Sequence, residues 1–369
     1  MLPSQAFTVQ EVAPLPVLQA PSLLLELGWP RRREGAEPSV DKLERSVDNG
    51  DYQIKGRDVR NKSQSDQWPR WIGASALLLL LILKSPQYVM AETKSSQELT
   101  HHLTGIAALA QPSPVITTPA GPFLLGSKRV DNDPYGNWTQ FDNTELPQHR
   151  VWLDRYEIDR DEVSLGEYLA FLQQQKLPPS DELQKLIWHV ISIHSVSDQI
   201  LSRWPALYVT WTEAKDLCKA KHKRLPTEAE WEKAARGPDG GLFPWGDANP
   251  DQTRAMFGQH HMHEIPILAG VDSHEAGKSP YGLHHTAGNV AEWVHDWFGF
   301  DYYAYMPERN PTGPTTGRYK SVRGGSWKSN RIMLRAATRG GAAPDQRSAT
   351  IGFRCAQSTV QEKTLPVVK

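Results

Sequence analysis

The chain has 369 residues, more than twice the commonest domain size, and its 41 basic and 42 acidic residues give a net charge of −1. A chain with so little net charge has no strong positive electrostatic field to attract a nucleic acid or an anionic membrane. We therefore expect neither as a partner of the folded region. Two cysteines are too few for a disulfide-dense mini-protein or a multi-cysteine zinc site. The 13 Trp, 27 Gly and 28 Pro favour irregular backbone held by aromatic packing.

The first 91 residues are predicted to be a disordered leader that carries a targeting signal. An apolar core at 72–83 falls short of the ~20 residues that span a bilayer, but its length is typical of a signal peptide. The small side chains of Val89 and Ala91 favour cleavage before Glu92; an uncleaved membrane anchor is the alternative. Membrane contact is expected only through this segment, and the rest of the chain is expected in the periplasm or another oxidising extracytoplasmic space.

Residues 92–114 are polar and rich in Ser, Thr and Gln, and we interpret them as a linker. Folded structure is expected to begin near Val115. A short strand is predicted within 118–127, where apolar residues are bracketed by Gly and Pro.

Three helix starts share one pattern, in which a Ser or Thr is followed three residues later by Glu. Each of the two side chains can then satisfy a backbone N–H that lacks a helical partner. The pairs are Ser164 with Glu167, Thr210 with Glu213, and Thr227 with Glu230. Apolar residues recur at helical spacing after each start, and Gly237 is predicted to end the third helix as a left-handed cap.

Six short motifs then follow one another in a recognisable order. They are 145–151 (ELPQHRV), 224–237 (RLPTEAEWEKAARG), 244–246 (PWG), 281–293 (YGLHHTAGNVAEW), 323–327 (RGGSW) and 352–355 (GFRC). In this order the chain resembles the formylglycine-generating enzyme (sulfatase-modifying factor) family over about residues 115–356, which leaves 357–369 as a tail. The resemblance implies an α+β fold, a duplicated C-type-lectin-like domain with little regular secondary structure and with bound calcium.

The founding activity of that family oxidises a cysteine of unfolded sulfatases to formylglycine, with copper held by two thiolates just after the Arg-Gly-Gly-Ser motif. A soft Cu(I) ion needs thiolate ligands. In this sequence Ser329 stands where the first thiolate would be, and a shorter loop leaves the second without a counterpart. We therefore expect neither copper nor formylglycine generation.

The two cysteines that are present match a different pair of the family. Cys218 and Cys355 occupy positions that, by the resemblance, form a disulfide between the second helix and the Gly-Phe-Arg-Cys strand. Two buried free thiols are the alternative, because Cys is among the most buried residue types.

Calcium ligands carry over only in part. Gly288, Val290 and Glu292 match one calcium site of the family, but the remaining position is His285. Imidazole is a poor ligand for calcium, so this site is expected to be weakened or to hold another metal. At the second calcium site of the family, Ala255 replaces an amide ligand.

Several histidines cluster in loops, namely His260, His261, His263, His284, His285 and His295, with Glu264 among them. Distant relatives bind iron, but their ligands come mainly from an additional helical domain with a His-x-x-x-His-x-Glu pattern that does not occur in this chain. Iron is therefore not expected, since a loop cluster of this kind is more often a surface feature.

The relatives bind an extended peptide in a groove near the Arg-Gly-Gly-Ser motif. The matching candidates are Ser326, Trp327, Ser329, Arg335 and Arg339. The arginines could clamp a carboxylate or a carbonyl of such a peptide, or form structural ion pairs. We predict that the chain, which lacks the copper-binding cysteine pair, is a divergent maturation factor or a peptide- or protein-binding module. A non-haem metal-dependent oxidase acting on a peptide or siderophore precursor is the alternative.

Overall fold

The computed structural model describes residues 86–128, 144–259 and 266–359, with side chains from residue 95 onward. All described residues belong to one compact unit, which lies within 69–369. The apolar core predicted at 72–83 lies outside the described residues. Of the tail predicted at 357–369, residues 357–358 belong to a strand, and 360–369 lie outside the described residues.

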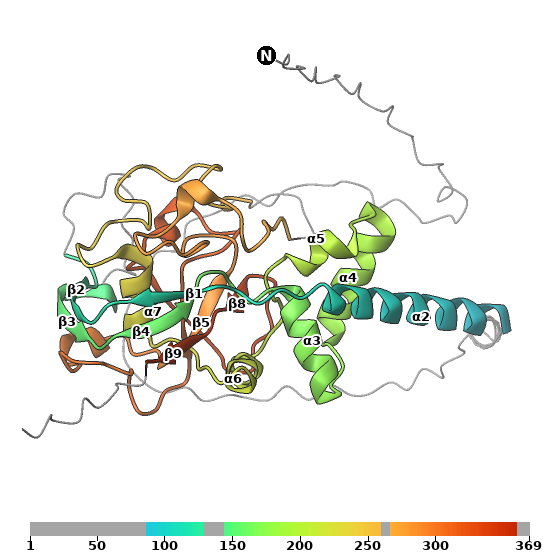
Figure 1. Ribbon diagram of the computed structural model, residues 1–369, viewed down its shortest axis with the longest axis horizontal. Coiled ribbons are helices and arrows are strands. Elements are labelled where there is room, and N and C mark those ends of the chain that lie inside the picture. The colour runs from blue at the N-terminus through green and yellow to red at the C-terminus, as the bar shows by residue number, and fades with distance from the viewer. Residues whose placement is uncertain (1–85, 129–143, 260–265, 360–369) are drawn as a thin grey trace, which may run out of the picture. The chain divides into compact units, whose positions relative to one another are not determined.

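Short strands and short helices alternate with long irregular segments (Figure 1), which confirms the expected α+β class. The helices are α2 (Pro86–Ala108), α3 (Leu165–Gln175), α4 (Asp181–His194), α5 (Asp198–Ser202), α6 (Trp211–Ala220) and α7 (Glu228–Arg236). The strands are β1 (Val115–Thr118), β2 (Gly121–Leu125), β3 (His149–Leu153), β4 (Tyr156–Asp159), β5 (Ala291–Trp297), β6 (Lys320–Arg323), β7 (Arg339–Ala342), β8 (Ile351–Phe353) and β9 (Ala356–Ser358). Among the described residues, 3₁₀ turns lie at Glu275–Gly277, Tyr302–Ala304 and Arg331–Leu334.

The strands of the described ranges form three small sheets with the orders β1-β4-β9, β2-β3 and β7-β6-β5-β8. All pairs are antiparallel except β5 with β8. Two registers position the site described below: Tyr156 of β4 pairs with Ser358 of β9, and Glu292 of β5 pairs with Arg323 of β6. Strand β9 thus lies beside a strand that comes about 200 residues earlier in the sequence.

All three predicted capping boxes are confirmed, at the starts of α3, α6 and α7. Gly237 ends α7 with a φ of 74° but a ψ of −172°, so it is not the left-handed helical cap we expected. Helices α4 and α5 were not predicted, because their N-caps Ser180 and Ser197 are followed three residues later by Leu183 and Ile200 and not by Glu.

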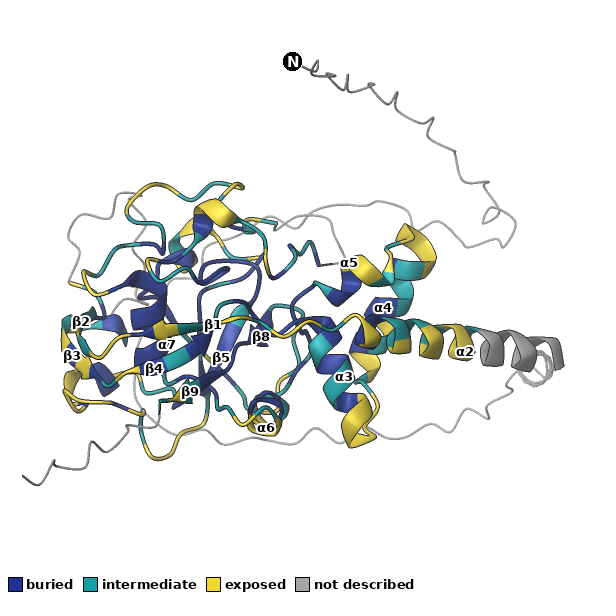
Figure 2. Ribbon diagram, in the orientation of Figure 1, coloured by how far each residue is buried: buried dark blue, intermediate teal, exposed yellow. Residues whose placement is uncertain are grey.

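The linker predicted over 92–114 is mostly helical, as α2 runs to Ala108. Its last turns pack against α3, α4 and α5, where Ile106 is fully buried in the largest apolar cluster, while its earlier described turns are exposed (Figure 2). His102 Nδ1 lies 2.7 Å from Asp198 Oδ1 of α5. Within the described ranges no helix has the length and apolarity that a bilayer span requires.

Cys218 of α6 and Cys355, just before β9, form the expected disulfide, with an S–S distance of 2.02 Å. Both cysteines are fully buried within the largest apolar cluster, together with residues of α3, α4 and β8. A second cluster, which includes Phe123, Val151 and Tyr156, lies between β2, β3, β4 and α7. The fully buried Trp231 and Trp293 pack between α7, α6 and β5.

Candidate binding site

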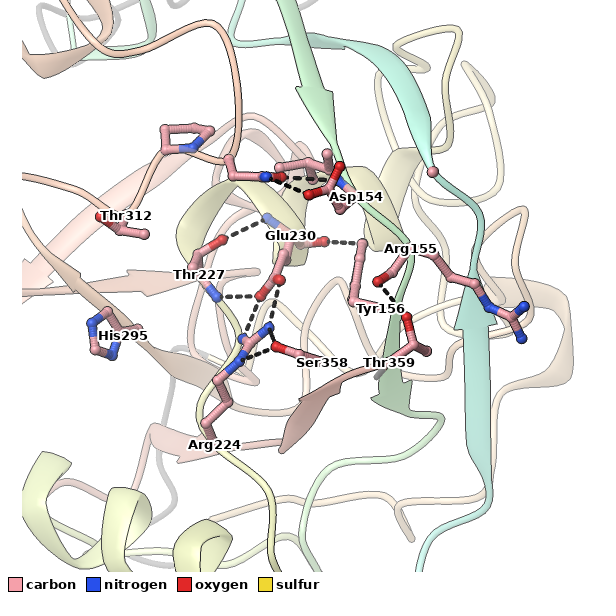
Figure 3. A pocket seen from close by; sticks show the side chains of 14 residues that line it. Asp154, Arg155, Tyr156, Arg224, Thr227, Glu230, His295, Thr312, Ser358 and Thr359 are labelled. Carbon is pink, nitrogen blue, oxygen red and sulfur yellow. Dashed lines mark hydrogen bonds and ion pairs between the residues drawn. The ribbon is translucent and has the colours of Figure 1, made fainter. Parts of the chain in front are cut away.

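A cavity of about 930 Å³ opens where the turn from β3 to β4, the start of α7, the end of β5 and the end of β9 meet (Figure 3). Most of the side chains around it are polar or charged. Its lining residues are Ala120, Leu153, Asp154, Arg155, Tyr156, Arg224, Thr227, Glu230, His295, Asn310, Pro311, Thr312, Ser358 and Thr359.

One wall is a fixed ion pair between Arg224 and Glu230. The guanidinium donates to both carboxylate oxygens at 2.6 and 2.7 Å and also to Ser358 Oγ at 3.1 Å. The same carboxylate accepts the Thr227 backbone N–H at 2.8 Å, as part of the capping box of α7. The hydroxyl of Tyr156 donates to the Glu230 carbonyl at 2.6 Å. A helix cap predicted from the sequence therefore also builds this wall.

A second wall joins the turn after β3 to a loop 156 residues later. The Asn310 side chain accepts from the Asp154 backbone N–H at 2.9 Å and donates to the Asp154 carboxylate at 2.8 Å. Arg309 also pairs with Asp154, and these contacts lower the pKa of that carboxyl, the Asn310 hydrogen bond most. The loop that carries Thr312 is thereby anchored against β3.

His295 contributes a neutral imidazole to the cavity. Loss of hydration lowers its pKa below 6.5, and the positive charges of Lys320 and Arg224 lower it further. Among the described residues neither of its ring nitrogens has a hydrogen-bond partner, and its ring lies 6.4 Å from that of Trp211. A neutral imidazole offers one donor and one acceptor, and both are available here.

The polar groups that remain available lie on two sides of the cavity. Figure 3 shows His295 and Thr312 on one side, and Arg155 on the other with its guanidinium pointing away from Glu230. Arg155 and Thr312 also have no side-chain partner among the described residues. Fixed walls with a few unpaired donors and acceptors suit binding of a polar, extended ligand more than proton transfer or nucleophilic attack.

The groove residues predicted near the Arg-Gly-Gly-Ser motif do not line this cavity. Ser326 Oγ and Ser329 Oγ lie 3.5 Å apart, and Ser329 Oγ accepts the Ser326 backbone N–H at 2.9 Å, which closes a tight turn after β6. Trp327 is 1% exposed, and its indole N–H donates to the Ala349 carbonyl at 2.9 Å. The turn is therefore filled by its own side chains.

The groove arginines are buried and paired. Arg335 donates to both carboxylate oxygens of Glu145, at 2.7 and 2.8 Å. Arg339 binds Glu228 in the same two-point manner at 2.7 and 2.8 Å, and Arg323 shares that carboxylate. Of the two roles considered for the arginines, the structure places them in structural ion pairs.

The four residues of the calcium-like site are all buried, but their side chains have other partners. The Glu292 carboxylate accepts two hydrogen bonds from Arg354, both at 2.7 Å, and one from the Trp231 indole at 2.8 Å. His285 Nε2 lies 3.0 Å from the Gly270 carbonyl. Gly288 and Val290 contribute backbone only; the Val290 N–H donates to Glu162 at 3.2 Å.

The histidine cluster is split by the fold. His260, His261, His263 and Glu264 lie outside the described residues, and His295 lies in the cavity. His284 is held between Asp161 at 2.6 Å and Glu275 at 3.1 Å. Across the described ranges, no three His, Cys, Asp or Glu side chains gather as a metal would need.

Sequence reasoning missed the cavity because its members come from distant segments. Thr227 and Glu230 carried a local signal, the capping box, and His295 stood out only as one histidine among several. No pattern in the sequence indicates that Asp154 and Asn310 meet, since their contact depends on the tertiary fold.

Comparison with known proteins identifies relatives. Residues 104–359 match the family model described as "Sulfatase-modifying factor enzyme 1-like domain". The chain is 30% identical to a formylglycine-generating enzyme of Streptomyces coelicolor, over 68% of this chain and 94% of that protein. It is also 30% identical to "Serine/threonine-protein kinase pkn1" of Chlamydia pneumoniae over 92% of this chain, but it spans only 52% of that relative. Among solved structures, PvdO from Pseudomonas aeruginosa matches with a TM-score of 0.50 and 21% identity, over 68% of this chain and 99% of that one, which supports the fold.

Proposed function

We propose that this chain, which belongs to the sulfatase-modifying factor family, is an extracytoplasmic peptide- or protein-binding module and not a generator of formylglycine. The observation that carries the proposal is that both cysteines are oxidised to a disulfide. The chain has two cysteines, and both are joined in the Cys218–Cys355 disulfide. No thiolate is left for copper, and a serine hydroxyl at position 329 cannot replace one.

The binding role rests on the cavity lined by Arg224 and His295. Its walls are fixed by ion pairs and hydrogen bonds, so little conformational freedom remains to be lost when a ligand enters. An extended peptide segment fits the cavity chemistry, because its backbone carbonyls and N–H groups can pair with His295 and Thr312.

The extracytoplasmic location is supported by the same disulfide. Bridges of this kind persist in oxidising compartments and are rare in the cytosol. Fractionation of cells that express the full chain, with thiol labelling of each fraction, tests this part; a cytosolic protein with two free thiols would contradict it.

A first experiment tests the absence of the founding chemistry. The purified chain is incubated with a cysteine-containing sulfatase peptide, copper and oxygen, and mass spectrometry follows the conversion of cysteine to the aldehyde. We expect no conversion, while the Streptomyces relative run in parallel converts the peptide. Any turnover above a no-protein blank refutes the proposal, and stoichiometric copper or iron in the purified chain would support the metal-dependent oxidase instead.

A second experiment tests binding. A displayed library of extended peptides is selected against the wild-type chain and against Thr312→Trp, which places a bulky side chain in the cavity. Enriched peptides should bind the wild type and lose affinity for this variant. Thr117→Trp, at an exposed position of β1, is the matched control and should bind as the wild type does. Equal binding to all three would show that the cavity is not the site.

A further inference from the structure

We propose that this domain holds the segment 284–292 with its own side chains instead of calcium, and that His285 is the residue that makes this position independent of metal. The inference does not depend on the proposed binding function. The resemblance to the family implies calcium here, and the donor atoms that the structure places at this position do not fit that ion.

His285 presents nitrogen where calcium requires oxygen. The side chain is 3% exposed, and its Nε2 lies 3.0 Å from the Gly270 carbonyl and 3.2 Å from Ser273 Oγ. A carbonyl only accepts, so Nε2 carries the proton and Nδ1 is the unprotonated nitrogen. This Nδ1 is buried and has no hydrogen-bond partner. Calcium selects oxygen ligands, so the buried lone pair of an imidazole does not supply what the ion needs.

The Glu292 carboxylate is already paired with a cationic side chain, Arg354. Arg354 is fully buried and binds both oxygens of Glu292, and its other N–H groups donate to the carbonyls of Arg160 and His284 at 2.7 and 2.8 Å. The guanidinium therefore neutralises Glu292 and also ties the segment to the end of β4.

The middle of the segment is held in the same way. The Asn289 amide donates to Glu162 at 2.6 Å and accepts the Ala269 backbone N–H at 3.0 Å, and the Val290 N–H donates to the other Glu162 oxygen at 3.2 Å. These bonds fix the backbone on both sides of the position where the ion would lie. In this structure, protein groups alone therefore hold residues 289 and 290.

The second calcium position of the family is closed by apolar packing. Ala255 is fully buried and packs with Phe243, Ala287 and Leu334. A methyl group in such a cluster offers no oxygen, so the amide ligand of this position is missing. Both positions point to the same conclusion, a domain that folds without calcium.

Thermal unfolding of the full chain tests the inference. The wild type is measured in excess EDTA and in excess calcium chloride, and we expect the same Tm in both. The His285→Asn variant restores a side-chain oxygen, so calcium should raise its Tm by roughly 5–10 °C when free calcium is about 100 times Kd. The matched control is His274→Asn. The His274 ring lies 5.2 Å from that of His285, but this histidine is not at the calcium position, so the variant should show no response.

Three results would overturn the inference: a wild-type Tm that falls in EDTA, a wild-type protein that retains stoichiometric calcium through purification, or a folded His285→Asn variant that calcium does not stabilise. Circular dichroism establishes whether that variant folds. If it does not, His285→Asp takes its place, and the wild-type measurements remain decisive by themselves.

Discussion

Removing the disulfide should lower stability by a predictable amount. Cys218 and Cys355 are 137 residues apart, and on the chain-entropy model a loop of that length restricts the unfolded chain by about 5 kcal/mol. In a domain of this size each kcal/mol shifts Tm by roughly 2–4 °C, so the loss should be on the order of 10 °C or more. No other cysteine is present to form a replacement bridge.

The assay compares three proteins by thermal and denaturant unfolding: the oxidised wild type, the wild type refolded after full reduction, and the Cys218→Ala, Cys355→Ala double variant. Both sulfurs are fully buried, so the double variant also loses packing, whereas the reduced wild type keeps it. The difference between oxidised and reduced wild type therefore isolates the cross-link. If thiol titration shows two free thiols and Tm stays within about 2 °C of the oxidised protein, the loop-entropy reasoning is wrong.

Three further predictions concern buried charge and helix capping. Burial lowers the pKa of Lys233 from 10.5 to about 8, so the unfolded chain binds more protons between these values. The free energy of unfolding should therefore gain up to ~3 kcal/mol as pH rises through this window, and Lys233→Met should flatten that slope in denaturant titrations; equal slopes would contradict the assignment. Glu228→Gln leaves two buried arginines without their shared carboxylate and should lower the free energy of unfolding, measured in urea, by about 3–5 kcal/mol. The control Asp216→Asn, at an exposed position, should leave that free energy unchanged. Thr210→Ala removes the cap of α6 and should cost about 1 kcal/mol, whereas Thr212→Ala on the exposed face of that helix should not destabilise; equal effects would rule out the capping role.

Features encoded by neighbouring residues could be predicted from the sequence. The Ser164, Thr210 and Thr227 capping boxes each involve two side chains three residues apart, so the pattern and the structure coincide. The α+β class and the Cys218–Cys355 bridge followed from the resemblance to the family and not from any local signal.

Features that depend on packing could not be predicted. The polar segment 92–114 was predicted to be a linker, yet α2 forms there because Ile106 and its neighbours are buried against α3 and α5. The arginines near Ser326 looked equally suited to ligand binding, and only the three-dimensional structure brings Glu145 to Arg335, across 190 residues of sequence. The cavity was missed for the same reason, since its two walls join residues 156 and 134 positions apart.

The pairing of β9 with β4 and of β8 with β5 bears on how the chain acquires its structure during synthesis. Residues 351–358 complete two of the three sheets and supply one sulfur of the bridge, so neither sheet nor bridge can close until those residues have been made. Earlier segments emerge from the ribosome with exposed apolar faces, which stay exposed until β8 and β9 have been synthesised. Such a delay leaves chaperones a long interval in which to shield the nascent polypeptide.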